Sequence, residues 1–448
     1  MGKKKTISGF SKLSKIGKIK WMVENFFKDP EIVMRELKSY WLQNEAQQKI
    51  IDGFSENTIS NFYLPFGVAP NFVINQKTYC IPMVIEESSV VAAASAAAKF
   101  WMTRGGFEAK VLSTTKVGQV HFLWEGNGDK LIQILEPLKT KLIQEATGIT
   151  KNMNERGGGI KEIILIDLTE KQSNYYQLKV TFETCDSMGA NFINSVLESF
   201  AKTLVQFIEA SDLMLGKEKE VDIIMSILSN YTPNCIVEAK VECPIEALNE
   251  AHPDIDGITF AKRFNTAVQI AQIDPYRATT HNKGIFNGID AIVLATGNDF
   301  RAVEASGHTY AAKDGQYKSL SHCLIENNTF KFYLRIPLAI GTVGGLTSLH
   351  PIAKRSLELL ENPNAEELMK ITASVGLAQN FAAIRSLITT GIQKGHMKMH
   401  LSNILNQLEA SEKEQEAAVQ FFENKVISYQ EVRTFLTDLR SGKLSLSQ

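Results

Sequence analysis

The sequence has little of several features that define large classes of protein. Its 448 residues include only five cysteines, an odd number with no pair at CxxC spacing. This pattern disfavours a disulfide framework and a structural zinc site, and it predicts a reducing compartment such as the cytosol. The 48 basic and 49 acidic side chains almost cancel, so no overall field favours nucleic acid as a partner. A small ligand is the better expectation.

Long hydrophobic segments are also missing. The longest apolar stretch, near Val90 to Ala98, is too short and too rich in alanine to span a bilayer, and the N-terminus has no signal-peptide core. We therefore expect a soluble, cytoplasmic protein. Met1-Gly2 followed by Thr6 fits the myristoylation template, but the surrounding lysines are also typical of a solvated basic tail, which is the commoner case.

The middle of the chain has the sequence pattern of a separate domain. Strand and helix patterns alternate over residues 113–219 in the order βαββα, which indicates a ferredoxin-like α+β domain inserted into a larger one. We expect strands at 117–124, 160–168 and 175–184, and helices at 129–146 and 190–208. Leu178, Val180 and Phe182 should share one face of the third strand. Residues 216–220 should form the exit linker.

The rest divides into a large mixed α/β domain, made of residues 1–112 and 220–390, and a helical flap at 391–448 that could close over a site. Capping boxes at Ser411 and Ser428 predict two short helices in this flap. In the large domain, residues 57–82 are predicted as short extended runs broken by Gly67 and Pro70. Further helices are expected at 19–27, 30–47 and 88–99 and from about residue 374, and strands at 235–241 and 329–336.

The turn Thr184-Cys-Asp-Ser-Met-Gly-Ala-Asn191 lies between a predicted strand and a predicted helix and is the strongest candidate for a cofactor cradle. Gly189 permits close approach of the backbone, and the N–H groups at the start of the helix favour a bound phosphate. Two further glycine groups, Gly157-Gly-Gly159 and Gly341-Thr-Val-Gly-Gly345, could line phosphates or simply make tight turns.

Reactive side chains lie in other segments. Lys283 is predicted on a glycine-containing turn at 279–285, and Asp299 on another turn at 297–301. The ammonium can stabilise a developing oxyanion, Asp299 can hold and tune the lysine, and Glu87 can act as an acid if a partly apolar pocket raises its pKa. Each of them could instead belong to a surface ion pair.

Two histidines near the C-terminus, His396 and His400, have the spacing of a metal pair on a helix. No third ligand is evident nearby. We therefore favour a general acid or a surface histidine and predict no metal site.

Seven segments of the chain carry these residues in order: Glu56-Asn57, Pro82 to Ser95, Asp186 to Asn191, Pro275 to Asp290, Gly297 to Asp299, Gly341 to Gly345, and Gly391 to Met397. Together they resemble the class II, bacterial-type 3-hydroxy-3-methylglutaryl-coenzyme A (HMG-CoA) reductases, and the resemblance covers about 57–400. Departures such as Ser187, where the family usually has alanine, touch no proposed catalytic position.

The resemblance implies an oxidoreductase that converts HMG-CoA to mevalonate and free coenzyme A. Two successive hydride transfers from NADPH or NADH would pass through a bound mevaldehyde stage. By position, Lys283 would stand beside the thioester oxygen, Glu87 would donate a proton, Asp299 would couple the two, and His396 would protonate the departing thiolate.

The resemblance also assigns binding residues. Arg277 would clamp the substrate carboxylate, for which a planar guanidinium is suited, and Ser89 and Asn287 would be neighbouring substrate contacts. The family's dinucleotide motif matches Asp186, Met188, Gly189, Ala190 and Asn191. In this family the nucleotide domain is ferredoxin-like rather than Rossmann, the site lies between the subunits of a homodimer, and a C-terminal helical flap covers it.

The choice of nicotinamide cofactor rests on one local difference from the family. NADH-preferring relatives carry an aspartate some seven residues before the Gly157 group, where this chain has Thr150-Lys151. A cation in place of that carboxylate favours a 2′-phosphate and hence NADPH.

Three other functions stay open from the sequence. One is a catalytically silent acyl-CoA-binding homologue, and another is the same enzyme running oxidatively in mevalonate catabolism. The third is a thioesterase or acyltransferase that uses a cysteine or serine with His396, but no GxSxG elbow is present.

Overall fold

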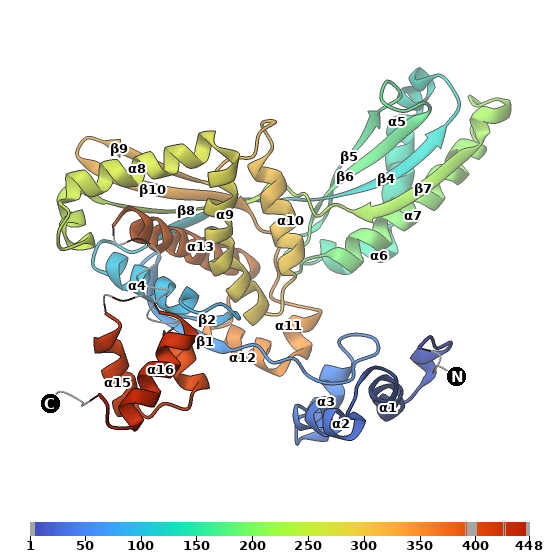
Figure 1. Ribbon diagram of the computed structural model, residues 1–448. Coiled ribbons are helices and arrows are strands. Elements are labelled where there is room, and N and C mark those ends of the chain that lie inside the picture. The colour runs from blue at the N-terminus through green and yellow to red at the C-terminus, as the bar shows by residue number, and fades with distance from the viewer. Residues whose placement is uncertain (1–4, 390, 392–400, 424, 426, 445–448) are drawn as a thin grey trace.

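The computed structural model of the protein describes residues 5–389, 391, 401–423, 425 and 427–444. It has a large central body, a smaller domain joined to that body, and helical groups formed by the first and last parts of the chain (Figure 1). No helix in the described part of the chain is long and apolar enough to cross a membrane.

The large body is built on a four-stranded antiparallel sheet in the order β3-β8-β10-β9. Its strands are β3 (Glu108–Thr114), β8 (Cys235–Pro244), β10 (Thr329–Pro337) and β9 (Ser321–Glu326). The sheet packs against α4 (Val90–Met102), α8 (Gly257–Ile273), α9 (Pro275–Ala295) and α13 (Ala365–Ile388). Helix α13 is buried on almost every side, as expected for a helix at the centre of a domain.

A two-stranded sheet of β1 (Phe66–Ile74) and β2 (Lys77–Val84) lies beside α4. The prediction of extended runs broken by Gly67 and Pro70 was wrong, because β1 passes through both residues. A register shift between Ala69 and Phe72 accommodates Pro70, which has no N–H to donate to the neighbouring strand. The body is completed by α10 (Phe300–Ala311), α11 (Leu346–Leu349) and α12 (Pro351–Leu359).

The smaller domain confirms the predicted ferredoxin-like fold. Its antiparallel sheet has the order β5-β6-β4-β7. The elements follow one another as β4 (Lys116–Trp124), α5 (Gly128–Glu145), α6 (Thr147–Asn154), β5 (Gly159–Asp167), β6 (Tyr175–Glu183), α7 (Ala190–Glu209) and β7 (Val221–Leu228). Leu178, Val180 and Phe182 are fully buried in its core, as expected.

The end of this domain differs from the prediction. Strand β7 pairs with β4, so the sheet runs past the boundary predicted at residue 219. Residues 216–219 form a short 3-10 helix that leads into β7 rather than an exit linker. The true exit is the segment between β7 and β8.

Lys283 lies in the middle of helix α9 and not on a turn, so that prediction was wrong. The helix runs through Gly284, the glycine that suggested a turn, and a Cβ atom there would make only an ordinary contact, 3.7 Å to the Ala383 Cβ. Gly288, one turn later, has a packing role. A Cβ atom at Gly288 would lie 2.9 Å from the Val375 carbonyl oxygen and from the Gln379 Cβ, both on α13. The missing side chain therefore lets α9 and α13 approach closely.

Two other helix predictions had wrong boundaries. The helix expected at 30–47 is two helices, α2 (Pro30–Ser39) and α3 (Glu45–Asp52), because Asn44 caps a new start. Helix α13 begins at Ala365 rather than near residue 374, after a capping box formed by Asn364 and Glu367.

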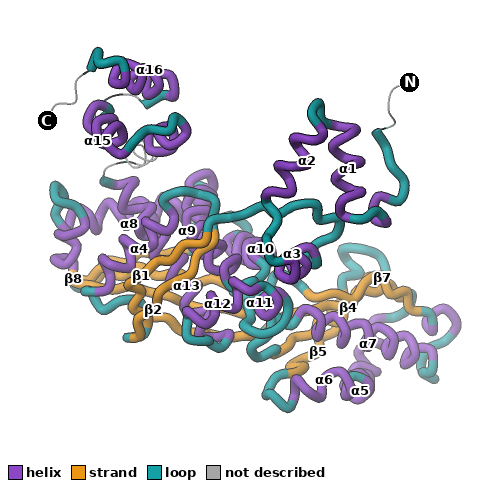
Figure 2. The backbone as a smooth tube through the Cα atoms, turned by 90° about the horizontal axis from the view of Figure 1, so that it is seen from below, coloured by secondary structure: helices purple, strands orange, loops and turns teal. Residues whose placement is uncertain are grey.

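Helices near both ends of the chain stand on the same side of the body and well apart (Figure 2). The first group is α1 (Lys15–Phe26) with α2 and α3, and the other contains α15 (Glu412–Phe421) and α16 (Tyr429–Arg440). Ser411 and Ser428 occupy the N-cap positions of α15 and α16, as predicted. Phe422, Phe435 and Leu436 are buried between these last helices.

Candidate active site

Lys283 and Glu87 form the central contact of the candidate site. The Nζ of Lys283, on α9, donates a hydrogen bond of 2.5 Å to Oε2 of Glu87, in the loop between β2 and α4. In the single chain the Lys283 side chain is 59% exposed and the Glu87 side chain 35%. The contact thus joins two segments that the sequence analysis singled out, on a surface that remains open.

Asp299 does not bond to this pair in the described part of the structure. It is the N-cap residue of α10, and its Oδ1 accepts hydrogen bonds from the backbone N–H groups of Arg301 and Ala302. Its Oδ2 lies 2.9 Å from the Arg301 guanidinium. The carboxylate that holds Lys283 here is therefore Glu87, and the expected direct Lys283–Asp299 couple is absent.

Helix α9 presents further candidate residues along the same stretch. Arg277 is half-buried, burial lowers the pKa of its guanidinium, and no bond joins its side chain to any other described residue. A partly desolvated cation without a counter-charge is well suited to a carboxylate ligand. Asn287 follows Lys283 by one helical turn and is also partly buried.

Ser89 is the N-cap residue of α4 and adopts a left-handed conformation with φ of 75°. Such a backbone costs a residue other than glycine of order 1–3 kcal/mol and tends to occur at ligand-binding sites. Ser89 lies two residues after Glu87, so the loop places both side chains near the start of α4.

The sequence analysis missed the role of Asp290 in this helix. Burial, the neighbouring Glu304 carboxylate and the Glu86 charge together raise the pKa of Asp290 from 3.8 to about 8. Its Oδ1 is buried without a hydrogen-bond partner in the described structure. Asp290 lies seven residues after Lys283, hence on the same side of α9, and that spacing was the available signal.

A large cavity of about 1140 Å³ lies beside the start of α7. Its lining includes Met188, Gly189, Ala190 and Asn191, together with Asp299, but neither Lys283 nor Glu87. Other parts of its wall are formed by side chains from residues 42–66, near the N-terminus, and by residues 341 and 343–347.

This cavity fits a nicotinamide dinucleotide. It is at least as large as typical small-ligand pockets, which span about 300–1,000 Å³. Gly189, with φ of 88°, is the N-cap residue of α7 and provides no side-chain cap, so the N–H groups of the first turn are left for an anionic ligand.

Other residues proposed for the cofactor have different surroundings. Oδ1 of Asp186 accepts a hydrogen bond of 2.8 Å from the backbone N–H of Ala365, at the start of α13. Asp186 therefore ties the nucleotide turn to the large body. The Gly157 group does not line the cavity, and its Gly158 packs tightly against the Glu183 carbonyl oxygen, which supports the structural interpretation. Thr150 is buried in α6 while Lys151 is exposed.

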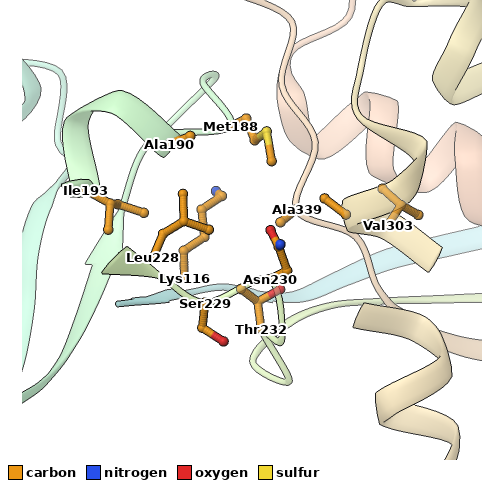
Figure 3. A pocket seen from close by; sticks show the side chains of 11 residues that line it. Lys116, Met188, Ala190, Ile193, Leu228, Ser229, Asn230, Thr232, Val303 and Ala339 are labelled. Carbon is orange, nitrogen blue, oxygen red and sulfur yellow. The ribbon is translucent and has the colours of Figure 1, made fainter. Parts of the chain in front are cut away.

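A smaller pocket lies on the other side of the nucleotide turn, where the two domains meet (Figure 3). Lys116 extends into it toward Ala190 and Met188, although this lysine is only 4% exposed. Among the described residues, its Nζ donates one long hydrogen bond, of 3.5 Å, to the Thr114 carbonyl oxygen. The volume of about 20 Å³ has room for one water molecule.

His396 and His400 lie outside the described residues, so the structure does not place the expected thiolate acid. The helices that follow them, α15 and α16, are described and form a small core of their own. Within the described part of the chain, no cluster of three His, Cys, Asp or Glu residues could hold a metal ion.

Comparisons with known proteins identify the family of the chain. A family profile described as hydroxymethylglutaryl-coenzyme A reductase matches residues 24–401. The chain is 37% identical over 401 residues to the 3-hydroxy-3-methylglutaryl-coenzyme A reductase of Archaeoglobus fulgidus, covering 89% of this chain and 86% of that protein. It is 32% identical over 411 residues to the probable reductase of Borreliella burgdorferi, covering 90% and 89%.

Comparison with solved structures finds the same family. The class II 3-hydroxy-3-methylglutaryl-CoA reductase of Streptococcus pneumoniae, bound to NADPH in open conformations, superposes with a TM-score of 0.70 at 33% identity. That superposition covers 92% of this chain and 100% of the other. The chain therefore belongs to the hydroxymethylglutaryl-coenzyme A reductase family, and to its bacterial-type class II branch.

Proposed function

We infer that this chain reduces 3-hydroxy-3-methylglutaryl-CoA to mevalonate and free coenzyme A, and that Lys283 and Glu87 form its reaction centre. The family of the chain supports the overall reaction. The observation that carries the assignment of residues is the 2.5 Å contact between Lys283 and Glu87. The two residues come from the two longest segments on which the resemblance rests.

The chemistry divides among the side chains by their charge. The Lys283 ammonium stabilises the negative charge that develops on the carbonyl oxygen when the carbonyl carbon is reduced. Glu87 accepts a hydrogen bond from that ammonium as a carboxylate, takes up a proton from solvent, and gives this proton to the oxygen in the aldehyde step. A bound NADPH or NADH supplies the hydride. Arg277 holds the substrate's free carboxylate, with Ser89 and Asn287 as adjacent polar contacts.

Two roles depend on groups that the described site does not bring together. Asp299 lines the large cavity and is held by Arg301, so its coupling to Lys283 requires that it exchange this partner when ligands bind. His396 protonates the departing thiolate from the flap, which makes coenzyme A a better leaving group. The flap helices α15 and α16 are proposed to close over the substrate.

A second subunit would complete this site. Tyr276, in the first turn of α9, is 87% exposed, and Lys283 lies two turns later on the same face of the helix. Ile273, the last residue of α8, is 73% exposed. Phe62, which lines the large cavity, is 91% exposed. Large apolar side chains that flank a half-open reaction centre favour a homodimer in which the partner covers Lys283.

The free thiols bear on the cellular location of the enzyme, and one lysine bears on its choice of cofactor. All five cysteines are unpaired, which supports a reducing, cytoplasmic location. Lys151, in the neighbourhood where NADH-preferring relatives carry an aspartate, favours NADPH over NADH. Initial rates with the two cofactors at matched concentrations test this preference, and equal or higher rates with NADH would contradict it.

The proposed function is tested by stoichiometry. Purified protein is mixed with HMG-CoA and reduced cofactor, and mevalonate, free thiol and oxidised cofactor are all measured. We expect two molecules of cofactor to be oxidised for each mevalonate and each thiol released. Binding of HMG-CoA without cofactor oxidation would identify a silent homologue, and thiol release without oxidation would identify a thioesterase.

A further inference from the structure

The side chain of Asn298 forms a two-point contact with the main chain of Gly341. Its Nδ2 donates a hydrogen bond of 3.0 Å to the Gly341 carbonyl oxygen, and its Oδ1 accepts one of 2.8 Å from the Gly341 N–H. Its Nδ2 also donates a hydrogen bond of 3.2 Å to Oγ1 of Thr296, a buried residue. Asn298 is therefore held in one orientation.

Gly341 in turn touches the dinucleotide turn. A Cβ atom at this position would lie 2.5 Å from the backbone nitrogen of Met188, so only glycine allows the approach. The next two residues, Thr342 and Val343, donate backbone hydrogen bonds of 2.8 and 3.3 Å to the carbonyl oxygen of Asp186. The loop that Asn298 holds is thus fastened to the turn that we assign to the cofactor.

On its other side Asn298 is joined directly to Asp299, the N-cap residue of α10. Gly297, with φ of 72°, leaves just enough space for the backbone of Leu346 and Thr347 at the start of α11. Asp299 therefore sits on a short segment whose preceding residues are both fixed against the 341–347 loop. The small pocket between Ala190 and Val303 shows how closely the starts of α7 and α10 face each other.

We propose that Asn298 is a positioning residue that holds the dinucleotide turn and Asp299 in a fixed relation through Gly341. This inference rests on the proposed roles of residues 188–191 in cofactor binding and of Asp299 in the reaction. Asn298 does not touch the reacting atoms in this account. It sets the geometry of two segments that must act on the same substrate.

Binding of the cofactor tests the first half of this proposal. NADPH is titrated into the full-length protein, without acyl-CoA, and its fluorescence gives the dissociation constant. Asn298→Ala removes two hydrogen bonds to the main chain and should raise this constant about ten- to a hundredfold, while the dissociation constant for HMG-CoA stays within about twofold. An unchanged affinity for NADPH, or an equal loss for both ligands, would overturn the proposal.

The chain offers a matched control for general destabilisation. Asn282 makes the same kind of contact with the main chain. Its side chain donates a hydrogen bond of 2.8 Å to the Lys318 carbonyl oxygen and accepts one of 3.0 Å from the Leu320 N–H. Asn282→Ala should lower the melting temperature about as much as Asn298→Ala, yet leave the NADPH dissociation constant unchanged. If both variants lost NADPH affinity alike, Asn298 would have no special link to the cofactor turn.

The link to Asp299 is tested with a double-mutant cycle on kcat. Asn298→Ala should lower kcat in the natural chain but have little further effect in the Asp299→Asn background, because both changes disturb one unit. Fully additive losses would contradict the positioning role. Turnover of the unmutated protein tests the proposed function separately. Failure of the positioning role of Asn298 can therefore be distinguished from failure of the proposed function.

Discussion

The ammonium of Lys283 and the carboxylate of Glu87 are 196 residues apart in sequence and 2.5 Å apart in space. Helix α9 fixes the first group and the start of α4 fixes the second, and both helices pack against α13. The pair therefore joins a central helix of the large body to the short loop that leads into α4. A reaction centre held in this way keeps its geometry through two reductive steps.

Replacing Glu87 by glutamine should separate proton donation from binding. Glu87→Gln retains a polar group of the same shape but cannot supply the proton, so kcat for reduction of free mevaldehyde should fall about 10²- to 10⁴-fold. The KM for mevaldehyde should change little. Steady-state kinetics with mevaldehyde check this, and near-normal kcat would remove Glu87 from the role of acid.

The histidine of the flap should matter for only one of the two steps. His396→Ala removes the proton that stabilises the departing thiolate, so turnover of HMG-CoA should fall by at least about a hundredfold. Reduction of free mevaldehyde, which releases no thiol, should be nearly unaffected. Parallel assays with the two substrates decide the matter, since equal losses would rule out a leaving-group role.

The charge and the shape of Arg277 can be tested apart. Arg277→Lys keeps the cation but loses the planar fork, so KM for HMG-CoA should rise about ten- to a hundredfold through the lost charged hydrogen bonds. The KM for NADPH should stay unchanged, which provides an internal control. A rise in both KM values would indicate a structural role for Arg277.

Asp290 should make stability depend on pH. Because its pKa is raised from 3.8 to about 8, the folded chain holds a proton that the unfolded chain releases. The free energy of unfolding should therefore fall as the pH rises from about 4 to 8. Asp290→Asn, which is neutral throughout, should flatten this part of the curve.

Denaturant unfolding at several pH values measures this effect. Asp256 provides the control, because backbone and side-chain hydrogen bonds from Thr259 lower its pKa. The stability that Asp256 contributes is present above about pH 4 and is lost in acid. Asp256→Asn should therefore leave the fall in the free energy of unfolding between about pH 4 and 8 intact. A slope that survives in Asp290→Asn would mean that another group is responsible.

Much of the fold could be predicted because its patterns are local. The strand containing Leu178, Val180 and Phe182 alternates cleanly, and the capping boxes at Ser411 and Ser428 mark helix starts directly. Strand β7 was missed because it lies at the edge of its sheet, where Ile224, Met225 and Ile227 are about half exposed. Its sequence, Val-Asp-Ile-Ile-Met-Ser-Ile-Leu, therefore lacks the clean apolar-polar alternation of a strand with one buried and one solvated face.

The sequence predicts a set of residues for the site but not the geometry in which they lie. Gly284 beside Lys283 suggested a turn, but the packing of α9 keeps the helix continuous through it, and the close contact of α9 with α13 is at Gly288. The pairing of Lys283 with Glu87 rather than with Asp299 likewise depends on how α9 and α4 pack. Asp290 went unnoticed because its raised pKa arises from burial and from Glu304 on another helix, both of which depend on the tertiary structure.

The most direct test of the account is the rate of HMG-CoA-dependent cofactor oxidation by Lys283→Ala. Alanine is a good helix former and the Lys283–Glu87 pair is partly exposed, so the fold should be kept, with a change in stability of about 1 kcal/mol or less. We expect loss of at least about a thousandfold in kcat with both HMG-CoA and mevaldehyde. Lys262→Ala, an exposed lysine on α8, should keep full activity. Near-normal turnover by Lys283→Ala would contradict the role of this ammonium in the reaction.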